Sequence, residues 1–572
     1  MTTMRAAGWG RSCSGRDVIP GGLVTARPML LTMLIGVLLT SPLSAGAANG
    51  APLAATESAY ADWLDANYAL ATIAAGPGSR VGGAGRTTWD QRRIAAEQRL
   101  RRGLATLSSD APDPESRRAI AAITTGLENP PYQPAAPAAD TAAVCATAGD
   151  TSLERKALSA ALYACFEQQG DHLAFEGHSI VRTTALELLQ ELDSSERRKA
   201  LFASFAPLWQ SLQADGGPSS PYRRLVRLAA DEGRKHGGTP VDAALRTVGV
   251  GRDSVERWLV AILSAWSAAT AGTPVEPWDY WHAHSAASRT LDARVPASRI
   301  LALSRAYYLD LGADLDRLGI AHDLAVRPGK APLAYCDYVR IGREVDGQWR
   351  APRARVSGNV EHGGLYVLNE IIHEDGHAVH ASAIHVRPAF SAWGDDLFVE
   401  AFADVTSWSV AEPAWQQRYL GRSTEQGASL RALYATVMLD VAWGLFELRM
   451  LRDPDADPNV VWTDITSRYL HVLPHPELPW WALRVQLVDM PGYMINYGLG
   501  AVLTADLRRR TREAIGPFDA GNPRWYAWTT QALLRHGASI ATPELLRTFL
   551  GRPVSPDALL AELARLGTTP PP

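Results

Sequence analysis

The sequence predicts a mainly α-helical protein that contains one small β element. Apolar residues recur at helical spacing through most of the chain, with clear examples at residues 91–104 and 255–270. Between residues 331 and 360 the pattern changes to short β-prone pieces around Asp346-Gly347, a dipeptide typical of a hairpin turn. Helical spacing resumes at Leu365, so we expect a hairpin or edge strand within an otherwise helical fold.

The composition is that of a globular protein with a large core. The chain has 572 residues, of which 47% are hydrophobic and 20% are charged. The formal net charge of −4 is small for this length, so it favours neither a nucleic acid nor an anionic membrane as a partner.

The N-terminal residues have the pattern of an export signal. Several arginines precede an apolar run over residues 29–39, and the triplet Ala45-Gly46-Ala47 offers a cleavage site. The run is shorter than the ~20 residues that a membrane span needs, so a retained anchor is the less favoured alternative. We therefore predict a signal peptide at residues 1–47, a periplasmic or secreted protein, and no stable membrane span after cleavage.

The remaining chain divides at a proline-rich segment, residues 129–137, which interrupts any helix. We expect an N-terminal helical region and linker at residues 48–150, and a main region that carries the candidate site at residues 151–567. The Pro-rich end, residues 568–572, is expected to be a disordered tail.

Three cysteines remain once the predicted signal is removed. In an oxidising compartment Cys145 and Cys165 could pair, which would leave Cys336 reduced, although spacing alone does not establish that disulfide. None of the three belongs to a metal-ligand or redox motif, so structural roles are favoured.

The segment His-Glu-Asp-Gly-His at residues 373–377 indicates a metal site. His373 and His377 are four residues apart, so on a helix both imidazoles project from one face, as two nitrogen ligands of zinc require. Glu374 lies beside them without being a ligand. It can act as the general base that takes a proton from the attacking water and later passes it to the leaving amine.

A second apolar helical segment, residues 397–408, supplies two carboxylates. Glu400 and Asp404 are again four residues apart, and Glu400 would complete a site for one Zn²⁺ per chain with an open fourth position. Asp404 is placed to accept the outer N–H of a ligand histidine. The alternative is that both are helix-surface carboxylates without a shared target. The apolar neighbours of Glu400 favour the metal site.

Three more histidines lie near the motif. His380 and His385 follow it, and His380 points away from the metal direction, so we expect it in a polar wall of the cleft. His362 precedes the helix and could reach a substrate. A solvated loop histidine is at least as good an interpretation of it.

The order of these motifs resembles the gluzincin metallopeptidases, in particular the thimet-oligopeptidase and angiotensin-converting-enzyme families. Residues 277–281 (Pro-Trp-Asp-Tyr-Trp) and 549–560 are similar to further segments of the thimet-type enzymes. The resemblance covers most of the chain from about residue 220. It implies a two-lobed, neurolysin-like helical zincin in which the zinc helices form the floor of a deep channel.

The segment Pro491–Gly500 is similar to the family segment whose tyrosines face the zinc. By that resemblance Tyr493 would contact the substrate, and Tyr497 would donate its O–H to the oxyanion. Both families carry a histidine shortly before these tyrosines, which this chain lacks. In the converting-enzyme register Gln486 takes that place, and Arg484 stands where those enzymes keep a cation for the substrate's C-terminal carboxylate.

We therefore expect an exported zinc metallopeptidase that cleaves short or unstructured peptides as an oligopeptidase or dipeptidyl carboxypeptidase. The alternatives are a zinc carboxypeptidase that releases single residues, and a non-catalytic homologue that retains zinc and binds peptides. A purely structural zinc site is the least favoured, because such sites use four protein ligands, mostly cysteines.

Overall fold

A computed structural model describes residues 47–566 except 77–80, 108–112, 133–144, 146–148, 151, 215, 271, 328–329 and 331–333. The predicted signal peptide, apart from its last residue, and the predicted tail lie outside these residues. So does most of the proline-rich linker from residue 133 onward.

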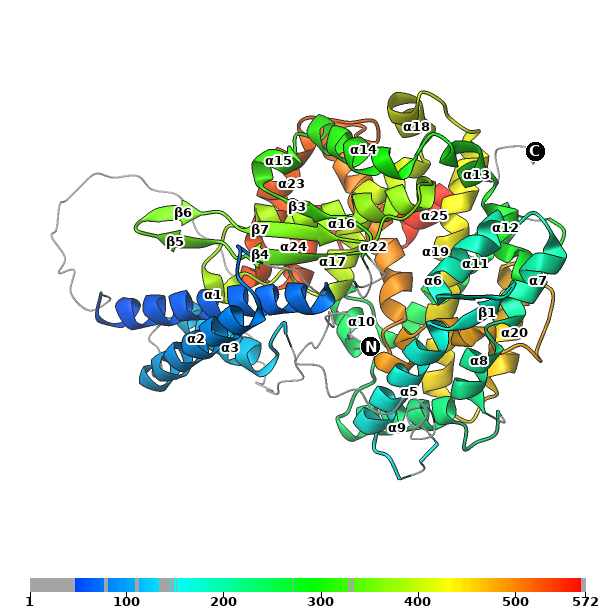
Figure 1. Ribbon diagram of the computed structural model, residues 1–572, viewed down its shortest axis with the longest axis horizontal. Coiled ribbons are helices and arrows are strands. Elements are labelled where there is room, and N and C mark those ends of the chain that lie inside the picture. The colour runs from blue at the N-terminus through cyan, green and yellow to red at the C-terminus, as the bar shows by residue number, and fades with distance from the viewer. Residues whose placement is uncertain are drawn as a thin grey trace, which may run out of the picture.

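One lobe is built almost wholly from helices (Figure 1, right). The helix α20 shows how such a helix begins: Asp457 accepts the amide of Asn459 at 2.8 Å, and Pro458 occupies the first turn, where its missing N–H costs nothing. The elements of this lobe are α5 (Arg155–Gly170), β1 (Leu173–Phe175), β2 (His178–Ile180), α6 (Arg182–Glu191), α7 (Ser195–Ala203), α8 (Ala206–Gln213), α9 (Pro221–Lys235), α10 (Asp242–Val248), α11 (Arg252–Ala269), η1 (Pro277–Asp279), α12 (Tyr280–His284), α13 (Ala286–Asp292), α19 (Gln426–Arg452), α20 (Pro458–Tyr469), η4 (Trp480–Leu483) and α21 (Gln486–Asp489).

The predicted β element is confirmed. The strands β3 (Ala321–Asp323), β7 (Arg353–Ser357) and β4 (Tyr335–Arg340) form a sheet in that order, with β3 parallel and β4 antiparallel to β7. Between β4 and β7, the hairpin β5 (Arg343–Val345) and β6 (Gln348–Arg350) turns at Asp346 and Gly347. These two residues have φ values of +52° and +73°, the left-handed conformation that a tight hairpin turn needs.

The second lobe packs helices around this sheet. Its elements are α14 (Ala297–Asp310), α15 (Leu315–Leu318), α16 (Leu365–Ala383), η2 (Pro388–Phe390), α17 (Asp396–Ser407), η3 (Trp408–Ala411), α18 (Pro413–Leu420), α22 (Ile495–Ile515), α23 (Trp525–Ala532), η5 (Leu534–Ser539), α24 (Thr542–Leu550) and α25 (Asp557–Leu566). Figure 1 shows α16, α17 and α22 in the middle of the molecule, and α22 contacts both α17 and α19. The fold is mainly α and two-lobed, as predicted.

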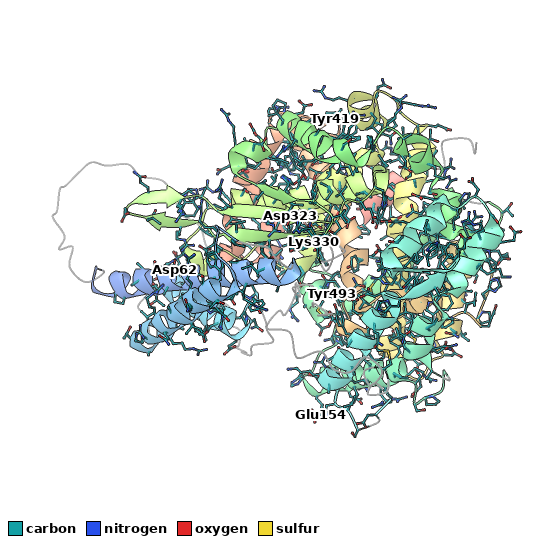
Figure 2. The ribbon with its side chains drawn as sticks, in the orientation of Figure 1. Asp62, Glu154, Asp323, Lys330, Tyr419 and Tyr493 are labelled. Carbon is teal, nitrogen blue, oxygen red and sulfur yellow. A yellow bond between two sulfur atoms is a disulfide. The ribbon has the colours of Figure 1, made fainter. Side chains whose placement is uncertain are left out.

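A layer of three N-terminal helices covers one side of the sheet: α1 (Ala47–Ala75), α2 (Arg86–Thr106) and α3 (Pro114–Glu128). The helix α1 is tied down by two arginines of the second lobe. Arg343 pairs with Asp62, labelled in Figure 2, at 2.8 Å, and Arg387 pairs with the buried Glu57 at 2.7 Å. One hydrophobic core cluster includes residues of these helices and of both lobes.

The pairing of cysteines that the sequence left open is resolved by the structure. Cys145 is bonded to Cys165, and Cys336 is buried and free. A second feature concerns membranes. Within the described residues one helix, Gly427–Arg452, is long and apolar enough to cross a bilayer, but 67% of its apolar window is buried inside the fold. Such burial is typical of a core helix, since a spanning helix would present that surface to lipid.

Asp337 on β4 gives a prediction about stability and pH. Its side chain is 4% exposed, and its Oδ2 atom has no hydrogen-bond partner in the described part of the chain. Burial raises the pKa of Asp337 to about 7, although Arg355 opposite it on β7 acts to lower the pKa. The folded protein therefore holds a proton that the unfolded chain releases near pH ~3.9.

Because the folded state binds that proton more tightly, the free energy of unfolding falls as pH rises from about 4 to about 7. We expect Asp337→Asn, which cannot ionise, to flatten this dependence, so that its melting temperature exceeds that of the unmodified protein by more at pH 8 than at pH 5. Melting temperatures of both proteins, measured between pH 5 and pH 8, test this expectation. Asp193→Asn, at a fully exposed carboxylate, is the control, and parallel pH profiles for Asp337→Asn and the unmodified protein would contradict the prediction.

Candidate metal centre

The helix α16 brings the two histidines of the motif together. It begins at Leu365, whose amide is capped by Asp292 Oδ1 of α13 at 2.7 Å. The spacing of four residues then directs His373 and His377 the same way, so their Nε2 atoms are 3.1 Å apart. Gly376 lets α17 approach closely, because a Cβ there would lie 3.0 Å from Ala403 Cα.

The helix α17 adds Glu400 to this pair. Glu400 Oε2 lies 3.3 Å from His373 Nε2 and 3.8 Å from His377 Nε2. Ligand atoms at 2.0–2.1 Å from a tetrahedral metal stand about 3.3–3.4 Å from one another. The three atoms, with separations of 3.1, 3.3 and 3.8 Å, therefore fit one zinc-sized ion and leave a fourth position open.

Glu374 is a rival for the third ligand, because it lies within 4.8 Å of both histidine ligand atoms. Glu400 lies within 3.8 Å of both histidine Nε2 atoms, and it comes from a second helix. A third ligand from a second helix surrounds an ion better than three from α16 alone. We therefore place Glu400 in the ligand set and leave Glu374 beside it.

The electrostatics of the cluster favour a cation. Burial acts to raise the pKa of Glu400, but His377 and His373 outweigh burial and hold that pKa well below its usual range. Burial likewise acts to lower the pKa of His373, but Asp404 and Glu400 hold it well above its usual range. A histidine whose proton is held by neighbouring carboxylates, as at His373, can exchange that proton for a divalent cation.

Asp404 holds the first histidine from behind. Its Oδ1 atom lies 2.8 Å from His373 Nδ1 and also accepts the Ser407 hydroxyl at 3.0 Å. With Nδ1–H donated to Asp404, the Nε2 atom of His373 is left as the atom that faces Glu400 and His377. The structure thus brings together the four predicted residues His373, His377, Glu400 and Asp404.

Glu374 is buried beside the two histidines. It is 9% exposed, and burial raises the pKa of Glu374 to about 6 against the opposing effect of His377 and His373. A carboxylate in such a water-poor position is a stronger proton acceptor than a solvated one.

Residues of α14 and β3 form hydrogen bonds with α16 that the sequence did not predict. Asp375 is fully buried, accepts the Ser304 hydroxyl of α14 at 2.5 Å, and lies 2.7 Å from His322 Nε2 of β3. Tyr308 donates its O–H to the Ile372 carbonyl at 2.7 Å. These bonds anchor the back of α16. The one sequence feature that could have indicated these bonds is Asp375 itself, a charged residue in the middle of an apolar helix.

The predicted tyrosine segment lies beside the centre. Gln486 Nε2 donates to the Tyr497 hydroxyl oxygen at 3.0 Å, which leaves the phenol hydrogen free to be donated elsewhere. Burial raises the pKa of Tyr497 to about 12, Arg484 lowers it and the charge of Glu400 raises it, so Tyr497 stays protonated. The Tyr493 ring, labelled in Figure 2, packs edge-on against Tyr497 at 5.8 Å between centroids.

Arg484 already has a carboxylate partner. Its guanidinium forms an ion pair with Asp440 and lies over the rings of Trp443 and Tyr497, at 4.7 and 5.7 Å from the centroids. Its side chain is 27% exposed. A substrate carboxylate would therefore have to share this cation with Asp440.

The expectation for His380 is wrong. It is 1% exposed and is enclosed by the rings of Trp393, Phe398 and Phe402, so it is a core residue and does not line a cleft. Burial lowers the pKa of His380 to about 3. His385 stacks on Trp349 at 4.0 Å between centroids.

His362 lies 3.1 Å from Glu187 of α6, which belongs to the other lobe. Its side chain is 50% exposed. It therefore links the start of α16 to the opposite lobe.

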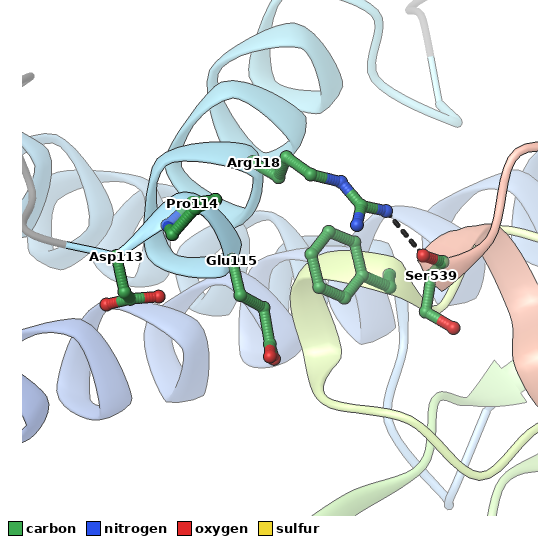
Figure 3. A pocket seen from close by; sticks show the side chains of 6 residues that line it. Asp113, Pro114, Glu115, Arg118 and Ser539 are labelled. Carbon is green, nitrogen blue, oxygen red and sulfur yellow. Dashed lines mark hydrogen bonds between the residues drawn. The ribbon is translucent and has the colours of Figure 1, made fainter. Parts of the chain in front are cut away.

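A surface hollow lies elsewhere, where α3 meets η2 and η5 (Figure 3). Arg118 crosses it, over the Phe390 ring and donating to the Ser539 carbonyl. No residue of the metal cluster lines it, so it has no part in the site.

Comparison with known proteins places the fold. No family model and no curated protein match the sequence. The M32 carboxypeptidase from Deinococcus radiodurans R1 matches in structure with a TM-score of 0.50 and 15% identity over 90% of this chain and 99% of that chain. A putative oligoendopeptidase F matches with a TM-score of 0.51 and 16% identity over 89% and 95%. The chain shares the fold of these two peptidases.

At this level of identity the likeness concerns the fold, and the function has to be argued from the site. These two structures are named for neither the thimet-oligopeptidase nor the angiotensin-converting-enzyme family, so the resemblance to those two families stays a prediction.

Proposed function

We propose that this protein is an exported zinc metallopeptidase that hydrolyses short or unstructured peptides, as an oligopeptidase or dipeptidyl carboxypeptidase. The observation that carries the proposal is the triangle of His373, His377 and Glu400, with Glu374 beside it. The peptidase fold of the two matching structures supports it.

The chain supplies each group that such a hydrolysis needs. When bound, zinc polarises the scissile carbonyl and makes water more acidic. Glu374 accepts the proton of the attacking water and passes it to the leaving amine. Tyr497, with its oxygen held by Gln486, donates its O–H to the developing oxyanion, a bond typically worth about 2.7–4 kcal/mol.

A compartment outside the cytoplasm is part of the proposal. The N-terminal signal pattern supports it, and the disulfide between Cys145 and Cys165 is of the kind that persists in an oxidising environment.

A carboxypeptidase that releases single residues is the second candidate, because one matching structure is named as a carboxypeptidase. The pairing of Arg484 with Asp440 reduces the positive charge available to a free C-terminus, so it counts against this candidate and equally against the dipeptidyl carboxypeptidase, and it favours the oligopeptidase. Glu374 is intact, which counts against a non-catalytic peptide-binding protein.

The test is digestion of a defined peptide library by the mature protein, followed by mass spectrometry. We expect fragments of two or more residues, loss of all cleavage with a zinc chelator, and recovery when zinc is restored. Stepwise loss of single C-terminal residues would indicate the carboxypeptidase. Stoichiometric zinc without any cleavage would contradict the proposal.

A further inference from the structure

A buried carboxylate in the core of the first lobe contacts the segment that carries the two tyrosines. Glu447 lies on α19 and is 2% exposed. Its Oε1 atom accepts the amide of Gly492 at 2.7 Å, and its Oε2 atom accepts the amide of Met494 at 2.7 Å. The backbone amide of Ile495 also acts to lower the pKa of this carboxyl group. These three amides flank Tyr493 and begin α22.

The start of α22 has no cap of its own. The first amides of a helix lack partners within the helix, and here the residue before the first turn, Met494, makes no side-chain cap bond. Glu447 supplies the missing acceptor from a neighbouring helix. The positive end of the α22 dipole favours an anion at this place.

A carboxylate is a costly group to bury, so its presence in the core calls for a reason. Burial raises the pKa of Glu447 to about 8, and the bonds from Gly492, Met494 and Ile495 act to lower it. Within the described residues Glu447 forms no ion pair. In the described part of the chain its carboxyl group accepts hydrogen bonds from the backbone amides of Gly492 and Met494.

Two other contacts restrict the same segment. Gly492 has a φ of +96°, and a Cβ there would lie 2.5 Å from Pro240 Cβ, so only glycine fits. Ser159 of α5 donates its hydroxyl to the Val488 carbonyl at 2.7 Å and to the Asp489 carbonyl at 2.8 Å. Gly492 is thus held against Pro240, and the residues just before the segment are held by Ser159. We infer that the remaining freedom of the start of α22 is set by the amides that Glu447 binds.

We propose that Glu447 is a positioning residue that sets Tyr493 and Tyr497 against the metal centre through the amides of Gly492 and Met494. Tyr497 lies in the first turn of α22, so a shift of this helix start moves its hydroxyl relative to His373 and Glu400. The inference rests on the proposed function, in which Tyr497 acts on the oxyanion.

The test is a double-mutant cycle with Glu447→Gln, Tyr497→Phe and the combined variant, measuring kcat and KM on one peptide. The glutamine side chain keeps one oxygen that can accept a hydrogen bond. Its NH2 group, however, would face a backbone N–H that needs an acceptor. We expect Tyr497→Phe to lower kcat by about 10²–10³-fold. Glu447→Gln should lower kcat by about 10-fold or more, with KM changed by less than about threefold, because it disturbs a transition-state contact. In the Tyr497→Phe background Glu447→Gln should change kcat by less than about threefold.

Asp506→Asn is the matched control. Asp506 is fully buried on the same helix α22, accepts the amide of Ser555 at 3.1 Å, and pairs with Arg552 at 2.6 Å. We expect it to lower the melting temperature as Glu447→Gln does, with kcat unchanged. Glu447→Asp keeps the carboxyl group, should fold if glutamine does not, and should give a smaller loss of kcat.

Three outcomes decide the matter. A loss of kcat that disappears in the Tyr497→Phe background supports the inference. Equal loss in both backgrounds, or a loss of melting temperature alone as in the control, overturns it. If Tyr497→Phe itself leaves kcat unchanged, the oxyanion role in the proposed function fails, and the inference fails with it.

Discussion

Replacing Glu374 by glutamine is expected to lower kcat for peptide hydrolysis by about 10²–10⁴-fold while zinc stays bound at one ion per chain. The two side chains have nearly the same shape, so the packing around this 9% exposed residue is kept. The amide cannot accept the proton of the attacking water. Zinc stays because His373, His377 and Glu400 make the closer triangle.

The measurement is kcat together with zinc content after dialysis. Glu370→Gln is the control, since Glu370 lies one turn earlier on α16 and burial also raises its pKa. We expect this control to change kcat by only a few-fold. Loss of zinc from Glu374→Gln would make Glu374 a ligand, and near-normal turnover would refute its role as the base.

Glu400→Ala is expected to abolish both zinc retention and activity, whereas Asp404→Asn should weaken zinc affinity by about 10–100-fold. The difference follows from position. Glu400 Oε2 is one of three atoms that would touch the ion, and Asp404 acts only through the Nδ1 atom of His373 at 2.8 Å. An amide at position 404 leaves the hydrogen bond weaker and His373 less well oriented.

Zinc per chain and the dissociation constant from chelator competition measure both effects. Excess zinc should restore activity to Asp404→Asn and fail to restore it to Glu400→Ala. Because an ion that binds only the folded state stabilises it, the melting temperature of Glu400→Ala should no longer respond to added zinc. Normal zinc retention by Glu400→Ala would require a different third ligand.

Much of the metal site could be predicted from the sequence, because its geometry is local. A spacing of four residues on a helix places His373 beside His377, and the same spacing places Glu400 beside Asp404. The β element is local too, since the turn at Asp346 and Gly347 marks the hairpin. In each case one periodicity or one turn determines which side chains share a face.

The partners of buried polar groups could not be predicted in this way. Nothing in the sequence pairs Asp375 with Ser304 and His322, or Arg484 with Asp440. His380 shares its helix with His373 and His377, yet Trp393, Phe398 and Phe402 enclose it in the core.

The sequence by itself determined the helical class, the β element and the residues able to form a zinc cluster. Only the tertiary structure decided which helices meet around that cluster, and that Glu447 of α19 binds the segment before Tyr497. The reason is physical. Helical and strand periods order side chains within a segment, whereas contacts between segments far apart in the chain depend on how the helices pack.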